Sequence, residues 1–339
     1  MTPVALSVLD LVPVSSGSTP ADALRATLQL ARDVDGLGFE RYWVAEHHNM
    51  PGIASSSPAV LIAHLASITS TIRVGSGGVM LPNHSPLAVA EQFGMLEALH
   101  PGRIDLGLGR APGSDRMTAM ALRRGRTIGG DDDFPTQLAE LIGYFDGSFA
   151  ETHPFGTIHA VPARGYKPAV WLLGSSDFSA HLAGELSLPF SFAHHFAGDN
   201  TTAAVQAYRA AFRPSSTLER PHLALGVNVV CADTDEEADW LAGSSRLAVL
   251  RLRQGRPGVY PSPEEAAAHP FTEMERDMVR SFTGNYVVGS PATVREGLLD
   301  LAARTGADEL IVTTNVHSPQ ARRRSYRLVA EAMQLAPVG

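Results

Sequence analysis

Cysteine is nearly absent from this sequence of 339 residues, and its scarcity excludes several kinds of protein. The one cysteine, Cys231, cannot form an intrachain disulfide and rules out a CxxC metal or redox motif. Charged residues make up 18%, below the roughly 25% of an ordinary domain, which argues against a disordered chain or a coiled coil. The net charge of −8 makes nucleic acid or an anionic membrane surface a poor partner.

Long apolar runs and a basic N-terminus are missing as well. No run approaches the roughly 18 residues of a membrane span, and no basic residue precedes Arg25, so neither a span nor a signal peptide is predicted. Hydrophobic residues make up 44%, which is enough to bury a large core. We therefore expect a globular, cytoplasmic protein with no membrane association.

Short apolar runs alternate with longer helix-like runs along most of the chain. Several helix-like runs open on proline, as in residues 19–22, where a threonine cap, Pro20 and an acid in the first turn coincide. This alternation predicts parallel βαβ units, and eight of them favour a (β/α)8 TIM barrel, with a doubly wound sheet as the alternative. The predicted strands are Val4–Val12, Arg41–Val44, Ile72–Val79, Arg103–Leu108, Ala169–Leu173, Phe190–Phe192, Leu223–Cys231 and Glu309–Thr313.

Two irregular stretches interrupt the pattern. We expect a single domain over residues 1–339, with insertions at about 110–167, after strand four, and at about 254–285, before the last helices. These insertions are long enough to cover the mouth of the barrel. Their aromatic residues are expected either to line an apolar pocket beneath that cover or to pack ordinarily. They are Phe134, Tyr144, Phe145, Tyr260 and Phe282.

Functional residues of such a barrel follow the C-terminal ends of its strands. After the second strand come Glu46, His47 and His48, which suit proton transfer or hydrogen bonding to a polar ring, or else form a satisfied polar cluster or a metal site. Neighbouring strand residues face opposite sides and the HExxH spacing is absent, so we predict no metal. A second pair, His194 and His195, follows strand six, where solvated or capping roles stay open.

Glycine and arginine mark the ends of strands three and four. The glycines of Val74–Val79 either leave room for something flat against the backbone or form a bulge in the barrel wall. Alternation in strand four turns Asp105 inward and the leucines outward. Arg110 at the mouth carries a guanidinium group suited to bind phosphate. The segment Gly174–Ser179 begins a helix and is interpreted either as an anion site or as an ordinary serine cap. Two basic clusters, 123–126 and 322–324, are interpreted as solvated faces.

Several of these segments together resemble the bacterial luciferase-like flavin-dependent monooxygenase family, in its single-chain oxygenase subgroup. The likeness covers nearly the whole chain, with its motifs in the right order. The matching stretches are Gly38–His48, Val74–Pro82, Pro101–Arg110, Gly174–Ser179, Leu188–Phe196 and Val287–Gly297.

The resemblance implies a barrel enzyme that uses FMN as FMNH2 and O2. Its chemistry would run through a flavin C4a-hydroperoxide and place one oxygen atom in an organic substrate by hydroxylation, epoxidation or Baeyer–Villiger insertion. Secondary metabolites such as aromatic polyketides are the substrates it suggests. It also implies a homodimer and, since the sequence carries no GxGxxG fingerprint, a separate NAD(P)H:flavin reductase. The competing hypotheses are a deazaflavin-dependent hydride-transfer oxidoreductase, a non-catalytic flavin-binding protein and a metal-dependent hydrolase.

The resemblance assigns roles to single residues as well. Glu46 and His47 match catalytic positions near the flavin ring, with His47 as the acid–base group. Ser76 and Gly77 match a pair joined by a non-proline cis peptide. Ser175 replaces an acidic residue of luciferase, and His194 replaces its ring-stacking tryptophan. The resemblance therefore implies a flavin-binding site but does not imply light emission. The residues matched to cofactor binding are Ser76, Gly77, Arg110, Ser175, Ser176, Ser179 and His194.

Overall fold

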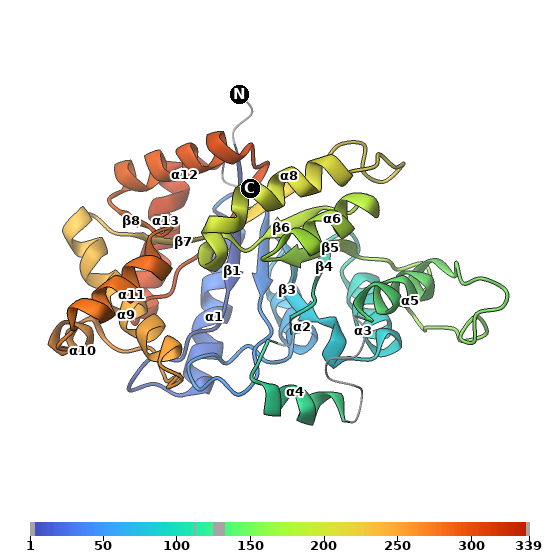
Figure 1. The fold of residues 1–339 in the computed structure, drawn as a ribbon, viewed down its shortest axis with the longest axis horizontal. Coiled ribbons are helices and arrows are strands. Elements are labelled where there is room, and N and C mark those ends of the chain that lie inside the picture. The colour runs from blue at the N-terminus through green and yellow to red at the C-terminus, as the bar shows by residue number, and fades with distance from the viewer. Residues whose placement is uncertain (1–3, 112, 125–132, 337–339) are drawn as a thin grey trace.

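A closed parallel barrel organises the chain in the computed structural model, which describes residues 4–111, 113–124 and 133–336 (Figure 1). Each barrel strand pairs with the next, the sixth pairs with the seventh, and the ninth joins the seventh to the first. The predicted TIM barrel is thus confirmed, and the doubly wound sheet is excluded. The barrel strands are β1 (Ala5–Asp10), β2 (Arg41–Val44), β3 (Arg73–Met80), β4 (Ile104–Gly109), β5 (Ala169–Gly174), β6 (Phe190–Phe192), β7 (Leu223–Cys231) and β9 (Glu309–Thr313).

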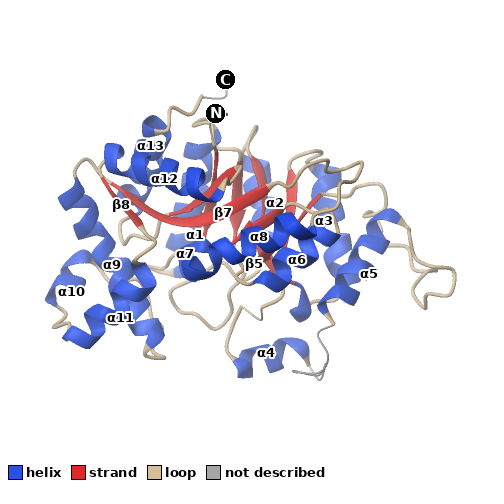
Figure 2. Cartoon of the chain, turned by 45° about the horizontal axis from the view of Figure 1, so that its top comes forward, coloured by secondary structure: helices blue, strands red, loops and turns tan. Residues whose placement is uncertain are grey.

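Helices surround the barrel, as Figure 2 shows, and most begin where the sequence predicts. Thr19 caps the first helix through its side chain, with Asp22 closing a capping box, and Pro20 is the first helical residue. The principal helices are α1 (Pro20–Asp35), α2 (Pro58–Ile68), α3 (Pro86–Leu99), α5 (Phe134–Asp146), α6 (Asp177–Glu185), α8 (Thr201–Ala211), α9 (Asp235–Arg253), α12 (Pro291–Thr305) and α13 (Pro319–Ala332).

Of the smaller elements, the sequence predicts only a helix at residues 272–281, which corresponds to α11 (Glu273–Thr283). The short strand β8 (Val287–Gly289) pairs only with the end of β7, beyond the barrel. The helix α4 (Arg116–Arg123) lies at the lower edge of Figures 1 and 2, on the side away from the N-terminus. The remaining short elements are η1 (Leu81–Asn83), α7 (His194–Ala197), η2 (Gly198–Asn200) and α10 (Pro263–Ala268).

Apolar residues form two layers on either side of the barrel wall. Strand alternation sends Ile104, Leu106 and Leu108 into the large outer cluster under the helices, as predicted. A smaller cluster fills the barrel itself, with Trp43 and Trp171 in edge-to-face contact at 5.1 Å between ring centroids. The inner cluster therefore closes the barrel as a packed core and leaves chemistry to the strand ends.

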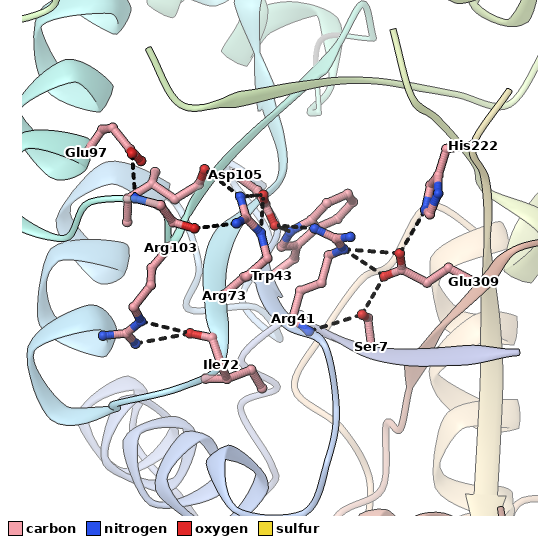
Figure 3. A network of polar contacts seen from close by, with 12 residues as sticks. Ser7, Arg41, Trp43, Ile72, Arg73, Glu97, Arg103, Asp105, His222 and Glu309 are labelled. Atoms are coloured by element: carbon pink, nitrogen blue, oxygen red, sulfur yellow. Dashed lines mark hydrogen bonds and ion pairs between the residues drawn. The ribbon is translucent and has the colours of Figure 1, made fainter. Parts of the chain in front are cut away.

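Buried charges fill the barrel at the beginnings of its strands (Figure 3). Asp105 accepts from Arg41 at 3.1 Å and from Arg73 at 2.9 Å, while Arg41 also donates to Glu309 at 2.8 Å. Burial alone would raise the pKa of Glu309, but the His222 hydrogen bond and the charge of Arg41 hold it at about 2. Asp105 faces the interior as predicted, yet at the end of the barrel opposite the candidate site.

Candidate active site

The C-terminal ends of β2, β3, β4, β5 and β6 meet at one end of the barrel because all barrel strands run parallel. The segments that follow these strands carry nearly every candidate residue. The sequence therefore places the candidates on one side of the molecule, and the structure shows which side chains face the barrel axis.

Glu46 follows β2 and is completely buried. Its carboxylate accepts from His48 Nε2 at 2.9 Å, from His84 Nε2 at 2.8 Å and from the backbone amide of Met80 at 3.0 Å. Burial would raise its pKa, but the His84 and His48 hydrogen bonds keep the pKa below the ordinary value. Both oxygens are thus engaged, so Glu46 ties the end of β2 to the end of β3. His84 was missed, because no sequence pattern pairs it with a carboxylate 38 residues earlier.

His47 points away from its neighbours. The strand places Trp43 and Ala45 in the inner cluster, and His47 continues that alternation. Its backbone amide donates to the carbonyl of Ser55 at 2.9 Å, while its ring Nδ1 is buried with no hydrogen-bond partner among the described residues. Burial lowers the pKa of His47, so the ring is neutral at pH 7 and can take up a proton from a ligand.

The end of β3 corrects one prediction. The non-proline cis bond joins Gly77 to Gly78, one residue later than the predicted Ser76–Gly77 pair. Ser76 stays in register with β4, where its hydroxyl donates to the carbonyl of Gly107 at 2.9 Å, and the register shifts only between Gly77 and Val79. A side chain at Gly78 would meet the Gly107 carbonyl at 2.6 Å. Only backbone and glycine hydrogens therefore face a ligand at Gly77 and Gly78.

The two halves of the predicted phosphate site lie together. The Arg110 guanidinium, just after β4, stacks over the ring of Phe178 in the first turn of α6, 4.3 Å from its centroid. Ser176 occupies the N-cap position of that helix, but its hydroxyl does not cap a helix amide. Ser175 precedes it, half-buried, while Ser179 is buried against Gly174. An arginine thus stands beside the amide-bearing end of α6, which attracts anions.

The second histidine pair is divided between two environments. His194 is buried, and its Nδ1 lies 2.7 Å from the Thr201 hydroxyl at the start of α8. His195 lies instead against Gly226 of β7, where a Cβ would come within 2.4 Å of its Nδ1. Gly226 is in register with Ile311 of the inner cluster, so His195 faces the barrel axis. The match of His194 to cofactor binding stays a prediction, and the structure shows that its Nδ1 lies beside Thr201.

The two insertions differ in what they cover. Tyr260 is tied to the segment after β1: its amide donates to Val14 at 2.8 Å, and its carbonyl accepts from Ser16 at 2.7 Å. Burial raises the pKa of Tyr260, with Tyr286 nearby raising it further. Phe282 lies under Arg253, at 3.7 Å. Residues 254–285 therefore lie along the mouth of the barrel, beside the segment that follows β1.

Three predicted lining residues of the first insertion lie in the core. Phe134, Tyr144 and Phe145 belong to the outer hydrophobic cluster, so their ordinary packing is correct and the predicted pocket lining is wrong. Of the basic cluster 123–126, Arg123 donates to Asn83 at 3.0 Å, while residues 125 and 126 lie outside the described residues. Within the predicted insertion 110–167, residues 112 and 125–132 lie outside the part of the chain that the structure describes.

The second basic cluster is only partly a solvated face. Arg322 is buried, with its guanidinium donating to Asp10 at 2.6 Å and to the Thr314 carbonyl at 2.9 Å. The prediction was wrong there because α13 turns Arg322 inward, toward a carboxylate 312 residues away. Arg323 and Arg324 remain partly exposed and pair with Asp33 and Asp233.

Metal and membrane features were also sought in the described part of the chain. Residues 4–111, 113–124 and 133–336 hold no group of three or more histidine, cysteine or acidic residues placed to bind a metal ion. In the same ranges, no helix has the length and apolar character needed to cross a bilayer.

Known proteins resemble this chain over nearly its whole length. The luciferase-like monooxygenase family model matches residues 4–309. A luciferase-like monooxygenase of Escherichia coli K12 is 46% identical over 331 residues, 98% of this chain and 97% of that protein. The N-acetyl-S-alkylcysteine monooxygenase of Bacillus subtilis is 36% identical over 338 residues, 98% and 99% of the two chains.

Solved structures of related proteins show the same barrel fold. The crystal structure of apo-MsnO8 has a TM-score of 0.91 at 42% identity and covers 99% of this chain and 100% of its own. More distant barrels share the fold alone: the FMN complex of the 3,6-diketocamphane monooxygenase oxygenating constituent from Pseudomonas putida and an F420-dependent secondary alcohol dehydrogenase both have TM-scores of 0.72, at 20% and 13% identity. The first covers 99% of each chain, and the second 98% and 99%. The chain therefore belongs to the luciferase-like monooxygenase family and is an enzyme of the flavin-dependent monooxygenase class.

Proposed function

We propose that this enzyme binds FMN in its reduced form and uses O2 to place one oxygen atom in an organic substrate, by hydroxylation or epoxidation. One observation carries the proposal: Arg110 stacked at the start of α6 lies at the same barrel end as the inward-facing His47, whose Nδ1 has no hydrogen-bond partner among the described residues. A guanidinium suits the phosphate of FMN, and a half-buried imidazole can hydrogen-bond to the polar edge of its ring.

The residues present fit the cofactor. Arg110, with Ser175 and Ser176 beside the first turn of α6, would hold the phosphate, and the buried Ser179 would support that turn. The bare backbone at Gly77 would face the ring, while Ser76 fixes that backbone to β4. Bound reduced FMN supplies the oxygen-activating chemistry. His47 would hold or move a proton at its Nδ1, and Glu46 would position the β3 end through Met80.

The second insertion, residues 254–285, would exclude water from the site. The backbone hydrogen bonds of Tyr260 to Val14 and Ser16 fix residues 254–285 against the segment after β1. Such a wall limits access of bulk water to a reactive cofactor. We infer that a secondary metabolite, such as an aromatic polyketide, enters beside this wall. The name of the 36%-identical relative makes N-acetyl-S-alkylcysteines a second substrate class to assay.

Cofactor identity separates this proposal from hydride transfer with a deazaflavin. The test is the Kd of the purified protein for FMN and for the deazaflavin F420, measured side by side. We expect FMN to bind more tightly, and a clear preference for F420 would reject the oxygenase reaction. Incorporation of 18O from 18O2 into an organic product, with chemically reduced FMN as the cofactor, then distinguishes an oxygenase from a binding protein.

Arg110→Ala should weaken FMN binding by about 1.5–3 kcal/mol, roughly 10- to 150-fold in Kd, the scale of a hydrogen bond to a charged group. Isothermal titration with FMN measures this loss. Riboflavin, which has no phosphate, is the matched control: its affinity should change little in the variant. An unchanged Kd for FMN would remove Arg110 from the phosphate site.

An NAD(P)H:flavin reductase would supply the reduced FMN, because the family pattern contains no nicotinamide-binding domain. Adding NADH to the enzyme and FMN alone should consume no O2. Adding any free-standing flavin reductase should start turnover.

We also propose a homodimer that buries the outer faces of α2 and α3. These neighbouring helices leave Val60, Met95 and Leu99 exposed by 72%, 53% and 66%, an apolar surface of the kind that marks interfaces. Val60→Glu with Met95→Glu should give monomers by light scattering, whereas Leu299→Glu, at an exposed leucine of α12, should leave the oligomer intact. A wild-type monomer at micromolar concentration would reject this interface.

A further inference from the structure

The strand order of the barrel sets two walls of the mouth opposite each other. β3 and β4 are neighbours, and so are β7 and β9, which lie four strands away on the other side of the closed barrel. Near its carboxyl end the first wall is bare, because strand alternation turns Gly77 of β3 and Gly109 of β4 inward. The opposite wall is therefore the one whose side chains can select a ligand.

That opposite wall carries two carboxamides. Ala224 of β7 and Ile311 of β9 belong to the inner cluster. The same alternation turns Asn228 and its register partner Thr313 toward the axis. Asn315, two residues later, continues this pattern and donates through Nδ2 to the Thr313 hydroxyl at 3.3 Å. The two asparagines are 7% and 8% exposed, so they are part of the wall and not of the outer surface.

The Asn228 carboxamide has one engaged end and one open end. Its Nδ2 donates to the backbone carbonyl of His195 at 3.0 Å. Because a carbonyl can only accept, this bond turns the amide nitrogen toward His195 and leaves the oxygen Oδ1 as the other end. Within residues 4–111, 113–124 and 133–336 no donor reaches that Oδ1, and the atom is still accessible to solvent. An open acceptor on this wall suits a ligand that donates an O–H or N–H group.

The neighbouring Asn315 gives a second, independent sign of a ligand. Its Oδ1 is buried and has no hydrogen-bond partner in the described part of the chain. Burying a polar oxygen in this way costs free energy unless a ligand or a water molecule supplies the missing donor. Carboxamides do not titrate, so this wall would select a ligand by hydrogen bonding and not by charge.

We propose that Asn228 binds the organic substrate, with its Oδ1 accepting a hydrogen bond from a hydroxyl or N–H group of that substrate. The inference rests on the proposed function, because it takes the bare wall at Gly77 to be the place of the flavin ring and the substrate to lie between that ring and Asn228. It adds a chemical requirement to both substrate classes. An aromatic polyketide would donate a phenolic hydroxyl, and an N-acetyl-S-alkylcysteine would donate its amide N–H.

A pair of probes isolates this hydrogen bond. 1-Naphthol offers a hydroxyl donor, and 1-methoxynaphthalene has a methyl group in place of that hydrogen. The Kd of each probe is measured by NMR titration of the FMN-loaded protein. The ratio of the two Kd values should change roughly 3- to 10-fold in favour of the methyl ether between the wild type and Asn228→Leu, the range of one neutral hydrogen bond. A purely structural role would weaken both probes together and leave the ratio unchanged.

Asn200→Leu, at an exposed asparagine of η2, is the matched control and should keep the wild-type ratio. The wild type alone supplies a second readout that needs no variant. In 15N-labelled protein, 1-naphthol should move the side-chain amide signal of Asn228 more than 1-methoxynaphthalene does.

The Kd for FMN, measured on the same samples, separates the inference from the proposed function. If the wild type binds FMN, an unchanged ratio in Asn228→Leu, equal movement of the Asn228 signal by both probes or no binding of 1-naphthol overturns the inference, and the proposed function stands. If the wild type does not bind FMN, both are rejected.

Discussion

His47→Ala lowers turnover by about 10²- to 10⁴-fold while FMN still binds, because a positioned proton donor or acceptor contributes on that scale. The side chain is half-buried, and its buried Nδ1 has no hydrogen-bond partner among the described residues, so the substitution breaks no hydrogen bond of that atom. Turnover with reduced FMN and the FMN Kd should be measured on the same sample. Full activity in the alanine variant would exclude His47 from the mechanism.

The pH dependence offers an independent check on His47. Burial lowers its pKa below the ordinary 6.5, so the wild-type ring stays neutral through pH 7 and gains a proton only in more acidic solution. A base of this kind predicts that kcat/KM falls as the pH drops below 6.5. His47→Ala should lose this acidic limb, and His159→Asn should keep it. An acidic limb that survives in the alanine variant belongs to another group.

Local signals predicted most of the fold. Proline at the first turn and a hydroxyl before it located α1, α2, α3 and α12 closely, because these residues act on the backbone at their own position. Most of the short elements escaped prediction because so few residues carry little periodicity. β8 is an example: it exists only because the end of β7 offers it a partner.

The candidate site was predicted less completely, since side-chain direction depends on distant contacts. The sequence placed two histidines after β6 but could not tell which one faces inward. Thr201 and Gly226 decide that question, and both lie on later elements. Glu46 shows the same limit: its type suggested proton transfer or hydrogen bonding to a polar ring, but the contacts of its oxygens with His84 and Met80 could not be predicted from the sequence.

Glu309→Gln should destabilise the protein by about 3 kcal/mol at pH 7, measured as the free energy of unfolding in urea. The wild-type carboxylate is fully buried and accepts from Arg41 and His222, so the neutral amide would leave part of a buried positive charge uncompensated (Figure 3). Its pKa is about 2 in the folded chain against an ordinary 4.5, a difference that corresponds to about 3 kcal/mol.

The pH dependence fixes the sign of this contribution. A carboxylate with a lowered folded pKa stabilises the fold fully above pH 4.5, and that stabilisation disappears as the pH falls toward 2. The wild type should therefore lose more stability between pH 5 and pH 2 than Glu309→Gln does, so the two curves converge in acid. Glu219→Gln, at an exposed carboxyl before β7, should follow the wild-type curve throughout. Parallel curves for the wild type and Glu309→Gln would show that the network stabilises the barrel by packing and not by the charge of Glu309.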